Sequence, residues 1–333
     1  MTKLSAATPT VGVIGAGYWG PNLARNFHEL GALGAVCDNN PQALEKLHTL
    51  YPDVRTYSDA DEMAADAYLT AIAVATSATT HGAMTRKFLE AGKHVFVEKP
   101  LCLDPVEAEE LGQLADDLDR TLMVGHLLLY HPAFQALQAA VTDGRVGTLQ
   151  YLYSNRASFG KIRIEESALW SFAPHDVSMI LALVGKLPSE VLGVAANYVT
   201  DGVSDVTVSH LFFDRGVQAH IFVSWLHPFK DHKLVVGGDK GVIVFNDSAS
   251  GDDKLILYPH TATFDGDLPI ANKAQGEAIP YGSSEPLRGE CQHFLDSVTA
   301  GTRPTSDWQE GARVLRVLSA CDASIQSGRR ETI

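Results

Sequence analysis

The sequence of 333 residues contains little cysteine and no long run of apolar residues. Its four cysteines form no C-x-x-C pair and do not stand beside histidines at metal-ligand spacing, so they predict reduced thiols and no metal site. No run of 18 apolar residues occurs, and the first ten residues lack the apolar core of a signal peptide. We therefore expect a cytoplasmic protein with no membrane partner.

Basic residues are also scarce. The chain has 26 Lys and Arg against 40 Asp and Glu, which gives a formal net charge of −14. A surface of this sign repels nucleic acid, so no nucleic-acid partner is expected. A small phosphorylated ligand remains compatible with this charge, because a few backbone N–H groups can bind a phosphate locally.

The first third alternates short apolar runs with helical patterns. Strands are expected at 11–14, 33–38, 71–75, 94–97 and 121–124, and helices at 21–30, 41–50, 81–91 and 105–118. Short joins between them indicate right-handed βαβ crossovers. Residues 1–125 are thus predicted to form an α/β domain with a doubly wound parallel sheet, whose ligands bind beyond the carboxyl ends of the strands.

The regular alternation of strand and helix patterns ends after residue 126. A helix at 132–141, an alternating stretch at 149–159 and a helix at 171–184 precede a series of β-like runs separated by Gly and Asp. Residues 126–333 are therefore predicted to form an α+β domain with a large, open, mostly antiparallel sheet, with a long loop at 261–286. The outer face of this sheet needs to be covered. Burying it between subunits would form a homo-oligomer, so we expect a homodimer or homotetramer.

One glycine-rich turn is a candidate cofactor site. Gly15, Gly17 and Gly20 form a G-x-G-x-x-G pattern that follows an apolar strand and opens a helix. Such glycines permit a tight turn, a close approach of pyrophosphate to the backbone, and close helix–strand packing. Asp38, 18 residues beyond Gly20, is suited to the ribose hydroxyls, and the uncharged Asn39 after it favours NAD over NADP. The alternative is a glycine-rich turn with no ligand.

Three further stretches carry a family resemblance. They are Ala-Val-Ala-Thr-Ser-Ala-Thr-Thr-His at 73–81, Gly-Lys-His-Val-Phe-Val-Glu-Lys-Pro at 92–100, and Leu-Trp-Ser-Phe-Ala-Pro-His-Asp-Val at 169–177. With the glycine loop, they resemble the glucose–fructose oxidoreductase, inositol dehydrogenase and rhizopine-catabolism (Gfo/Idh/MocA) family. The resemblance covers nearly the whole chain. It implies a Rossmann domain, a second domain with an open antiparallel sheet, and hydride transfer between NAD and a sugar or cyclitol carbon.

The resemblance also assigns site residues. The cofactor contacts it implies, together with those of the glycine loop, are Gly15, Gly17, Tyr18, Trp19, Gly20, Asp38, Asn39, Thr76, Ser77, His81, Glu98 and Lys99. For catalysis it implies that Lys99 orients the reacting hydroxyl and that His175 is the acid/base. The residues expected at the substrate are Lys99, Tyr130, Arg156, Lys161, Arg163, Ser171 and His175.

The proton acceptor is left open between two residues. A histidine titrates near neutral pH, and a lysine beside a positive nicotinamide has its charged form disfavoured, so either can take the proton of the alcohol. We favour His175 as base and Lys99 as orienter. Relatives often carry an aspartate one helical turn before this histidine, where Ser171 stands here. This departure shifts some weight toward Lys99.

The substrate is inferred from finer features. Gly-Tyr-Trp-Gly-Pro-Asn-Leu at 17–23 and Leu-Trp-x-x-Ala-Pro-His-Asp at 169–176 most resemble the branch acting on UDP-linked N-acetylhexosamines or their uronates, at C3. Arg156, Lys161 and Arg163 are candidate cations for the diphosphate, or else an exposed basic edge. The alternatives are a free cyclitol or aldose dehydrogenase, and a nucleotide-sensing protein that performs no turnover.

Overall fold

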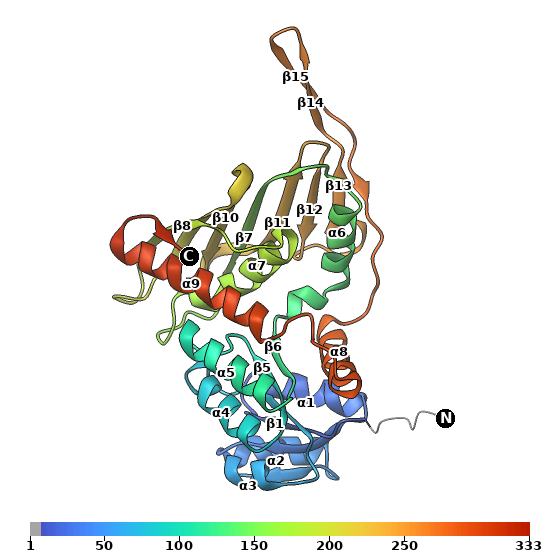
Figure 1. Ribbon diagram of the computed structural model, residues 1–333, viewed down its shortest axis with the longest axis vertical. Coiled ribbons are helices and arrows are strands. Elements are labelled where there is room, and N and C mark those ends of the chain that lie inside the picture. The colour runs from blue at the N-terminus through green and yellow to red at the C-terminus, as the bar shows by residue number, and fades with distance from the viewer. Residues whose placement is uncertain (1–7) are drawn as a thin grey trace. The chain divides into compact units, whose positions relative to one another are not determined.

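The structure is a computed structural model in which residues 8–333 are described, and the chain forms two compact units (Figure 1). The first comprises the chain up to Tyr130 together with Glu285–Leu315, and the second comprises His131–Ser284 with Arg316–Ile333. The sequence predicts one domain boundary, between residues 125 and 126. The structure differs from it, because Glu285–Leu315 returns to the first unit.

The first unit is built on a six-stranded sheet in the order β3-β2-β1-β4-β5-β6, in which every neighbouring pair is parallel. Its strands are β1 (Val11–Ile14), β2 (Leu33–Cys37), β3 (Arg55–Tyr57), β4 (Ala71–Val74), β5 (His94–Glu98) and β6 (Leu122–Gly125). Its helices are α1 (Gly20–Glu29), α2 (Pro41–Leu50), α3 (Ala60–Ala65), α4 (Ala78–Glu90), α5 (Pro105–Asp117), the 3₁₀ turn η1 (Leu127–Tyr130) and α8 (Pro286–Ala300). The Rossmann prediction is confirmed, although the sequence reading missed β3 and α3.

Local sequence explains where these elements lie. All residues of β1, β4 and β6 are buried, as expected for parallel strands that are covered on both faces. Helix α2 begins where the Asn40 side chain accepts a hydrogen bond from the Gln42 backbone N–H, and α5 where Asp104 accepts one from Val106. In each helix a proline at the first position provides a backbone angle that already suits a helix.

Helix α8 belongs to the first unit because of its aromatic packing. The ring of Phe294 lies edge-on against Phe96 of β5 at 5.9 Å and against Phe27 of α1 at 6.4 Å, between ring centroids. All three side chains are fully buried. The chain therefore returns to this sheet after completing the second unit, which a linear division of the sequence could not anticipate.

The second unit contains a nine-stranded sheet in the order β16-β13-β12-β11-β7-β10-β9-β8-β17. Its strands are β7 (Leu149–Phe159), β8 (Glu190–Ala196), β9 (Val206–Phe212), β10 (Gln218–Ser224), β11 (Leu226–Gly238), β12 (Val242–Asn246), β13 (Leu255–Tyr258), β16 (Glu277–Ala278) and β17 (Glu331–Thr332). The other elements are α6 (Pro132–Thr142), α7 (Ala168–Val184) and the 3₁₀ turns η2 (Asp214–Gly216) and η3 (Gly251–Lys254), while α9 (Trp308–Ser327) begins in the first unit. Only β7 and β10 pair in parallel, so the predicted mostly antiparallel sheet is confirmed.

The two faces of this sheet differ. Helix α7 packs against β7, β9 and β10. On β10, Ala219, Ile221 and Val223 are buried, whereas the alternating Gln218, His220 and Phe222 are not. On the alternating side, the rings of Tyr153 and His220 stack at 5.2 Å. The homodimer or homotetramer expected from this second face stays a prediction.

The predicted loop at 261–286 is wrong. It contains β16 and a two-stranded hairpin, β14 (Thr261–Asp265) with β15 (Leu268–Asn272), that extends away from the nine-stranded sheet (Figure 1). The hairpin was missed because its apolar residues do not form a core: Phe264 and Leu268 are both strongly exposed. The strand signal of a buried, alternating face is therefore weak here.

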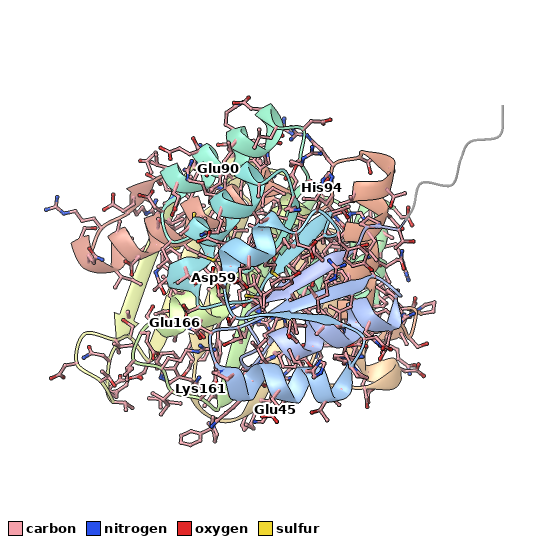
Figure 2. All side chains as sticks on the ribbon, turned by 90° about the horizontal axis from the view of Figure 1, so that it is seen from below. Glu45, Asp59, Glu90, His94, Lys161 and Glu166 are labelled. Carbon is pink, nitrogen blue, oxygen red and sulfur yellow. The ribbon has the colours of Figure 1, made fainter. Side chains whose placement is uncertain are left out.

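Within residues 8–333, no helix is both long and apolar enough to cross a bilayer. The surplus of acid is visible at the surface of the first unit, where Glu45 of α2, Asp59 before α3 and Glu90 of α4 are exposed (Figure 2). All four cysteines are buried and none is in a disulfide.

The packing of α8 predicts a clear stability difference. Phe294→Ala should lower the free energy of unfolding by about 3–5 kcal/mol, because it removes a fully buried ring from between two others. Phe264→Ala in the exposed hairpin is the matched control and should change it by less than about 0.5 kcal/mol. Denaturant unfolding of both variants measures this, and equal midpoints for the two would contradict the packing described.

Candidate active site

The glycine loop is packed tightly against the end of β4. Gly15 has φ of +97°, and a Cβ there would lie 2.6 Å from the carbonyl of Ala75. A Cβ on Gly20 would lie 1.7 Å from the carbonyl oxygen of Gly15, so the first turn of α1 closes directly over the loop. Both positions need glycine for physical reasons, a left-handed backbone at one and close approach at the other.

The same loop leaves an anion site open. A Cβ on Gly17 would meet nothing within 4 Å. Helix α1 begins with Trp19 as its N-cap, has no side-chain capping bond and has no acid in its first turn, and the neighbouring Tyr18 is 92% exposed. Uncapped N–H groups at a helix N-terminus favour a phosphate group, so the loop fits the pyrophosphate of a dinucleotide.

Asp38 lies at the end of β2, beside this loop. Its Oδ2 accepts the backbone N–H of Ala16 at 2.6 Å, and its Oδ1 accepts that of Asn40 at 2.8 Å. These bonds fix the carboxylate while each oxygen keeps a further acceptor position, as binding of two ribose hydroxyls requires. Asn39 is exposed and carries no charge that would attract a 2′-phosphate.

The loop after β4 is held from beneath by His81 of α4. Its Nδ1 lies 2.7 Å from the carbonyl of Pro100, and its Nε2 lies 3.1 Å from that of Thr76. Burial lowers the pKa of His81, and the two carbonyls oppose that shift. The structure thus places this residue between backbone carbonyls of two loops, and its predicted contact with the cofactor stays a prediction. Thr76 and Ser77 remain exposed or half-exposed at the strand end.

Glu98 and Lys99 end β5 in the Glu-Lys-Pro motif. The indole Nε1–H of Trp19 donates a hydrogen bond to Glu98 Oε1, which joins the glycine loop to this motif. A Cβ on Gly125 of β6 would lie 3.0 Å from Glu98 Oε2, so the carboxylate lies across the neighbouring strand end. Burial raises the pKa of Glu98, while the Trp19 bond and the charge of Lys99 oppose that rise.

Tyr130 is built into the first unit. Its hydroxyl oxygen lies 2.9 Å from Ser306 Oγ and accepts the Ser306 backbone N–H at 3.2 Å. The ring is buried, and this hydroxyl already has protein partners, so the substrate contact predicted for Tyr130 gains no support from the geometry. Nearby, His126 Nδ1 is bound by the Glu310 carboxylate, an interaction that the sequence reading did not anticipate.

In the second unit, α7 carries Ser171 and His175 one helical turn apart. Ser171 is buried and His175 half-buried. Pro174 lies inside the helix, and because it has no N–H the carbonyl of Trp170 lacks the usual donor four residues further along. The predicted helical placement of the histidine motif is therefore found, with a proline directly before the histidine.

Asp176 is fully buried and binds Arg156 of β7. Arg156 donates from Nε to Asp176 Oδ2 at 2.8 Å and from Nη2 to Oδ1 at 3.2 Å, and the Ser154 hydroxyl also donates to this carboxylate. Arg156 Nη1 approaches His232 Nδ1 at 3.3 Å, and burial with the Arg156 charge lowers the pKa of His232 to about 3. Arg156 therefore has its charge balanced inside the protein, and the diphosphate contact predicted for it gains no support from this geometry.

The other two predicted cations lie in the segment between β7 and α7. Arg163 pairs with Glu166 at 3.0 Å, and Lys161 is exposed (Figure 2). The sequence analysis gave Asp176 no role, although an acid among the mostly apolar, buried residues of this helix was a usable signal. Such an acid needs a cationic partner, and Arg156 on the packed strand provides it.

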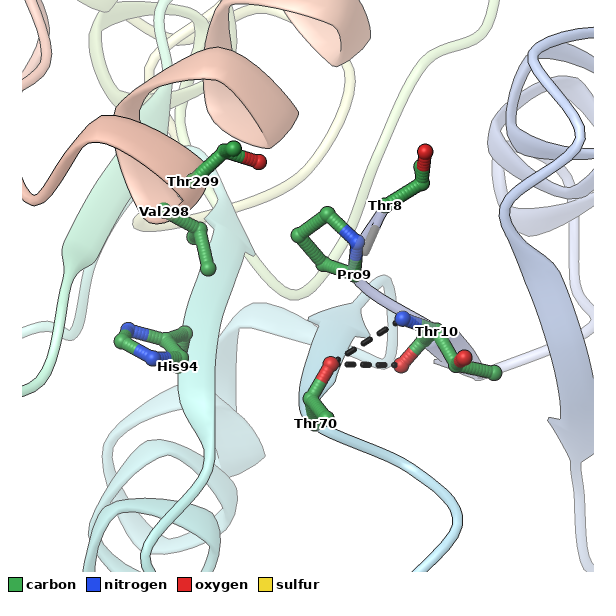
Figure 3. A pocket seen from close by; sticks show the side chains of 7 residues that line it. All are labelled: Thr8, Pro9, Thr10, Thr70, His94, Val298 and Thr299. Carbon is green, nitrogen blue, oxygen red and sulfur yellow. Dashed lines mark hydrogen bonds between the residues drawn. The ribbon is translucent and has the colours of Figure 1, made fainter. Parts of the chain in front are cut away.

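A separate hollow lies at the other edge of the six-stranded sheet. It is lined by Thr10, Thr70 and His94 near the amino ends of β1, β4 and β5, together with Val298 and Thr299 of α8 (Figure 3). Burial lowers the pKa of His94 to about 4. This edge carries none of the predicted site residues. Among the described side chains, no group of three or more His, Cys, Asp or Glu is arranged to hold a metal ion.

Comparison with known proteins identifies the two units. Residues 10–126 match the model of the Gfo/Idh/MocA oxidoreductase family with an NAD-binding Rossmann fold, and residues 134–244 match the C-terminal domain of the same family. The chain belongs to the Gfo/Idh/MocA family. Its first unit is thus an NAD-binding Rossmann unit, in agreement with the open helix N-terminus and with Asp38.

Individual members of the Gfo/Idh/MocA family resemble this chain at moderate identity. UDP-N-acetylglucosamine 3-dehydrogenase of Acidithiobacillus ferrooxidans is 26% identical over 91% of this chain and 93% of its own, and its structure superposes with a TM-score of 0.84. Inositol 2-dehydrogenase of Rhizobium meliloti is 26% identical over 98% of this chain and 99% of its own. A putative oxidoreductase of Magnetospirillum magnetotacticum is 31% identical over 95% of this chain and 100% of its own, with a TM-score of 0.82.

The cofactor loop yields a matched pair of substitutions. Gly17→Ala should fold with unchanged stability, because its Cβ enters open space, but should weaken NAD binding about tenfold or more by occupying the approach of the pyrophosphate. Gly20→Ala should lower the free energy of unfolding by about 1–3 kcal/mol, because its Cβ overlaps the Gly15 carbonyl. Thermal unfolding and calorimetric NAD titration distinguish the two effects. Unaltered NAD affinity in a folded Gly17→Ala protein would contradict this placement of the pyrophosphate.

Proposed function

We propose that this protein oxidises the C3 hydroxyl of a UDP-linked N-acetylhexosamine or its uronate, with NAD as the hydride acceptor. The observation that carries the substrate assignment is the similarity to a UDP-N-acetylglucosamine 3-dehydrogenase over 91% of this chain. Two motifs support it, Gly-Tyr-Trp-Gly-Pro-Asn-Leu in the cofactor loop and Leu-Trp-x-x-Ala-Pro-His-Asp along the start of α7.

The chain supplies proton transfer and orientation. NAD⁺ accepts a hydride from the carbon that bears the hydroxyl, so the protein must remove the hydroxyl proton as the hydride leaves. We assign the proton to the imidazole of His175 and the orientation of the hydroxyl to the ammonium group of Lys99. The carboxylate of the neighbouring Asp176 is used by Arg156, which anchors α7 to β7 instead of acting on the substrate.

Recognition of a UDP group requires cations outside this buried pair. Lys161 and Arg163, in the segment before α7, are the proposed partners of the diphosphate. Arg163 is paired with Glu166 at a site where both side chains are partly exposed. An ion pair in that setting is weak, so a diphosphate can compete for the arginine.

A substrate panel tests the assignment. The protein is mixed with NAD and with UDP-N-acetylglucosamine, its uronate, myo-inositol or free hexoses, and NADH formation is followed by absorbance. We expect the highest kcat/KM with a UDP-sugar and a rise in its KM in a Lys161→Ala, Arg163→Ala double variant. The runner-up is a cyclitol dehydrogenase, which the equally similar inositol 2-dehydrogenase favours. Turnover of inositol with none of any UDP-sugar would reject the proposal.

Two substitutions test the catalytic roles. His175→Asn should lower kcat by about 10²–10⁴-fold and abolish the loss of activity at acidic pH, because that loss reports protonation of the base. Lys99→Met should lower kcat while retaining the acidic limb, and both variants should still bind NAD. His210→Asn, at an exposed position of β9, is the control. Unchanged NAD reduction by Lys99→Met would remove that residue from catalysis, and loss of the acidic limb in Lys99→Met alone would make lysine the base.

A further inference from the structure

A second buried acid lies beside Glu98, on helix α8. Glu290 is 0% exposed, and neither of its carboxyl oxygens has a hydrogen-bond partner among the described residues. Burying an ionised carboxylate without a donor is far more costly than burying a protonated one. Packing alone therefore does not explain why a carboxyl group is buried at position 290.

The packing of α8 on β5 places Glu290 toward Glu98. Phe294 of α8 contacts Phe96 of β5. Residues four apart share a helix face, so Glu290 lies one turn before Phe294 on the same face. Residues two apart share a strand face, so Glu98 lies on the same side of β5 as Phe96. Glu98 and Glu290 therefore face each other beside the Phe96–Phe294 contact, on the side nearer to the carboxyl ends of the strands.

Different groups of the described residues act on the two sides of this pair. On the Glu98 side they are the Trp19 indole, Lys99 and His126, the last of which is bound by Glu310. On the Glu290 side they are Tyr130 of η1, whose pKa is raised by burial and by Glu290, and Cys291, whose pKa is raised by burial and by both acids. Arg25 and Glu285 form an ion pair at the exposed start of α8. Burial and the Glu98 charge raise the pKa of Glu290 well above its usual value.

We propose that Glu98 and Glu290 hold one proton between them at neutral pH, carried by Glu290, and that Glu290 is a positioning residue that keeps Glu98 ionised beside the nicotinamide. Glu98 has a donor in Trp19 and a neighbouring cation in Lys99, whereas Glu290 has neither, so the charge settles on Glu98. This inference rests on the proposed contact of Glu98 with the cofactor and is independent of which sugar is oxidised.

The pair also links protonation to the redox state of the cofactor. The oxidised nicotinamide ring is positively charged and the reduced ring is neutral. A positive ring favours loss of the Glu290 proton, so NAD⁺ should bind more tightly relative to NADH as pH rises. The protonated pair retains a single negative charge, and the deprotonated pair carries two.

The first test follows stability without cofactor. The pKa of Glu290 is raised in the folded protein. Its contribution to the free energy of unfolding is therefore fully present below its pKa in the unfolded chain, ~4.3, and is lost as pH rises through its pKa in the folded protein. Glu290→Gln keeps the shape of the side chain and stays neutral. Its free energy of unfolding should therefore increase relative to that of the natural protein as pH is raised from 6 to 9, as measured by denaturant unfolding at each pH. Glu285→Gln removes an acid from the exposed start of the same helix and should show no such trend, because the Arg25 pair lowers the pKa of Glu285. A Glu290→Gln protein that is less stable at every pH would overturn the proposal.

The second test needs no variant to fold and reads the proton directly. Infrared difference spectra of the natural protein between pH 6 and 9 should show loss of a protonated carboxylic acid band. The absence of such a band at pH 6 would mean that Glu290 is ionised, and the proposal would fail.

The closing experiment is the pH dependence of the ratio of NADH to NAD⁺ dissociation constants, measured by titration calorimetry. In the natural protein and in Glu285→Gln the ratio should increase with pH, by up to about tenfold per pH unit when one proton is linked. In Glu290→Gln it should be flat. A buried proton that titrates while the ratio stays flat in the natural protein would overturn the positioning role. Failure of the proposed sugar oxidation would instead leave all these binding measurements unchanged.

Discussion

The edge-on packing of Phe294 against Phe27 and Phe96 is the contact on which the first unit depends. It brings a helix from the last fifth of the chain onto a strand from the first third and aligns the two. This alignment places the polar groups of α8, including Glu290, near the carboxyl ends of the strands. The aromatic contact therefore determines both the stability of this unit and the charge environment of Glu98.

The second unit depends on a polar contact of comparable depth. Asp176 and Arg156 are both buried, and the bidentate bond between them joins α7 to the centre of the nine-stranded sheet. Breaking such a pair leaves one uncompensated charge in the interior, which is why paired burial is maintained even where it adds little net stability. This ion pair also fixes where His175, the residue before Asp176, lies relative to the nine-stranded sheet.

The sequence predicted the parts that depend on local patterns. Apolar runs ending in Gly15, Asp38 and Glu98 identified a doubly wound sheet and its ligand edge, because these signals lie within short segments. The return of α8, the exposed hairpin at Thr261–Asp265, and the pairing of Arg156 depend on contacts between distant residues or on a lack of contacts. His81 illustrates the same limit: its motif was recognised, but its carbonyl partners at Thr76 and Pro100 required coordinates.

The Arg156–Asp176 pair also bears on how freely the segment before α7 can change. The pair connects β7 to the middle of α7, and the partly exposed segment of residues 160–167, which contains Lys161 and Arg163, lies between these two elements in the sequence. Because the helix is anchored to the sheet from below, this segment can change in length and charge without moving the residues on α7. If Lys161 and Arg163 bind the diphosphate as proposed, the ligand contacts of this segment are mechanically separate from the position of His175 on α7.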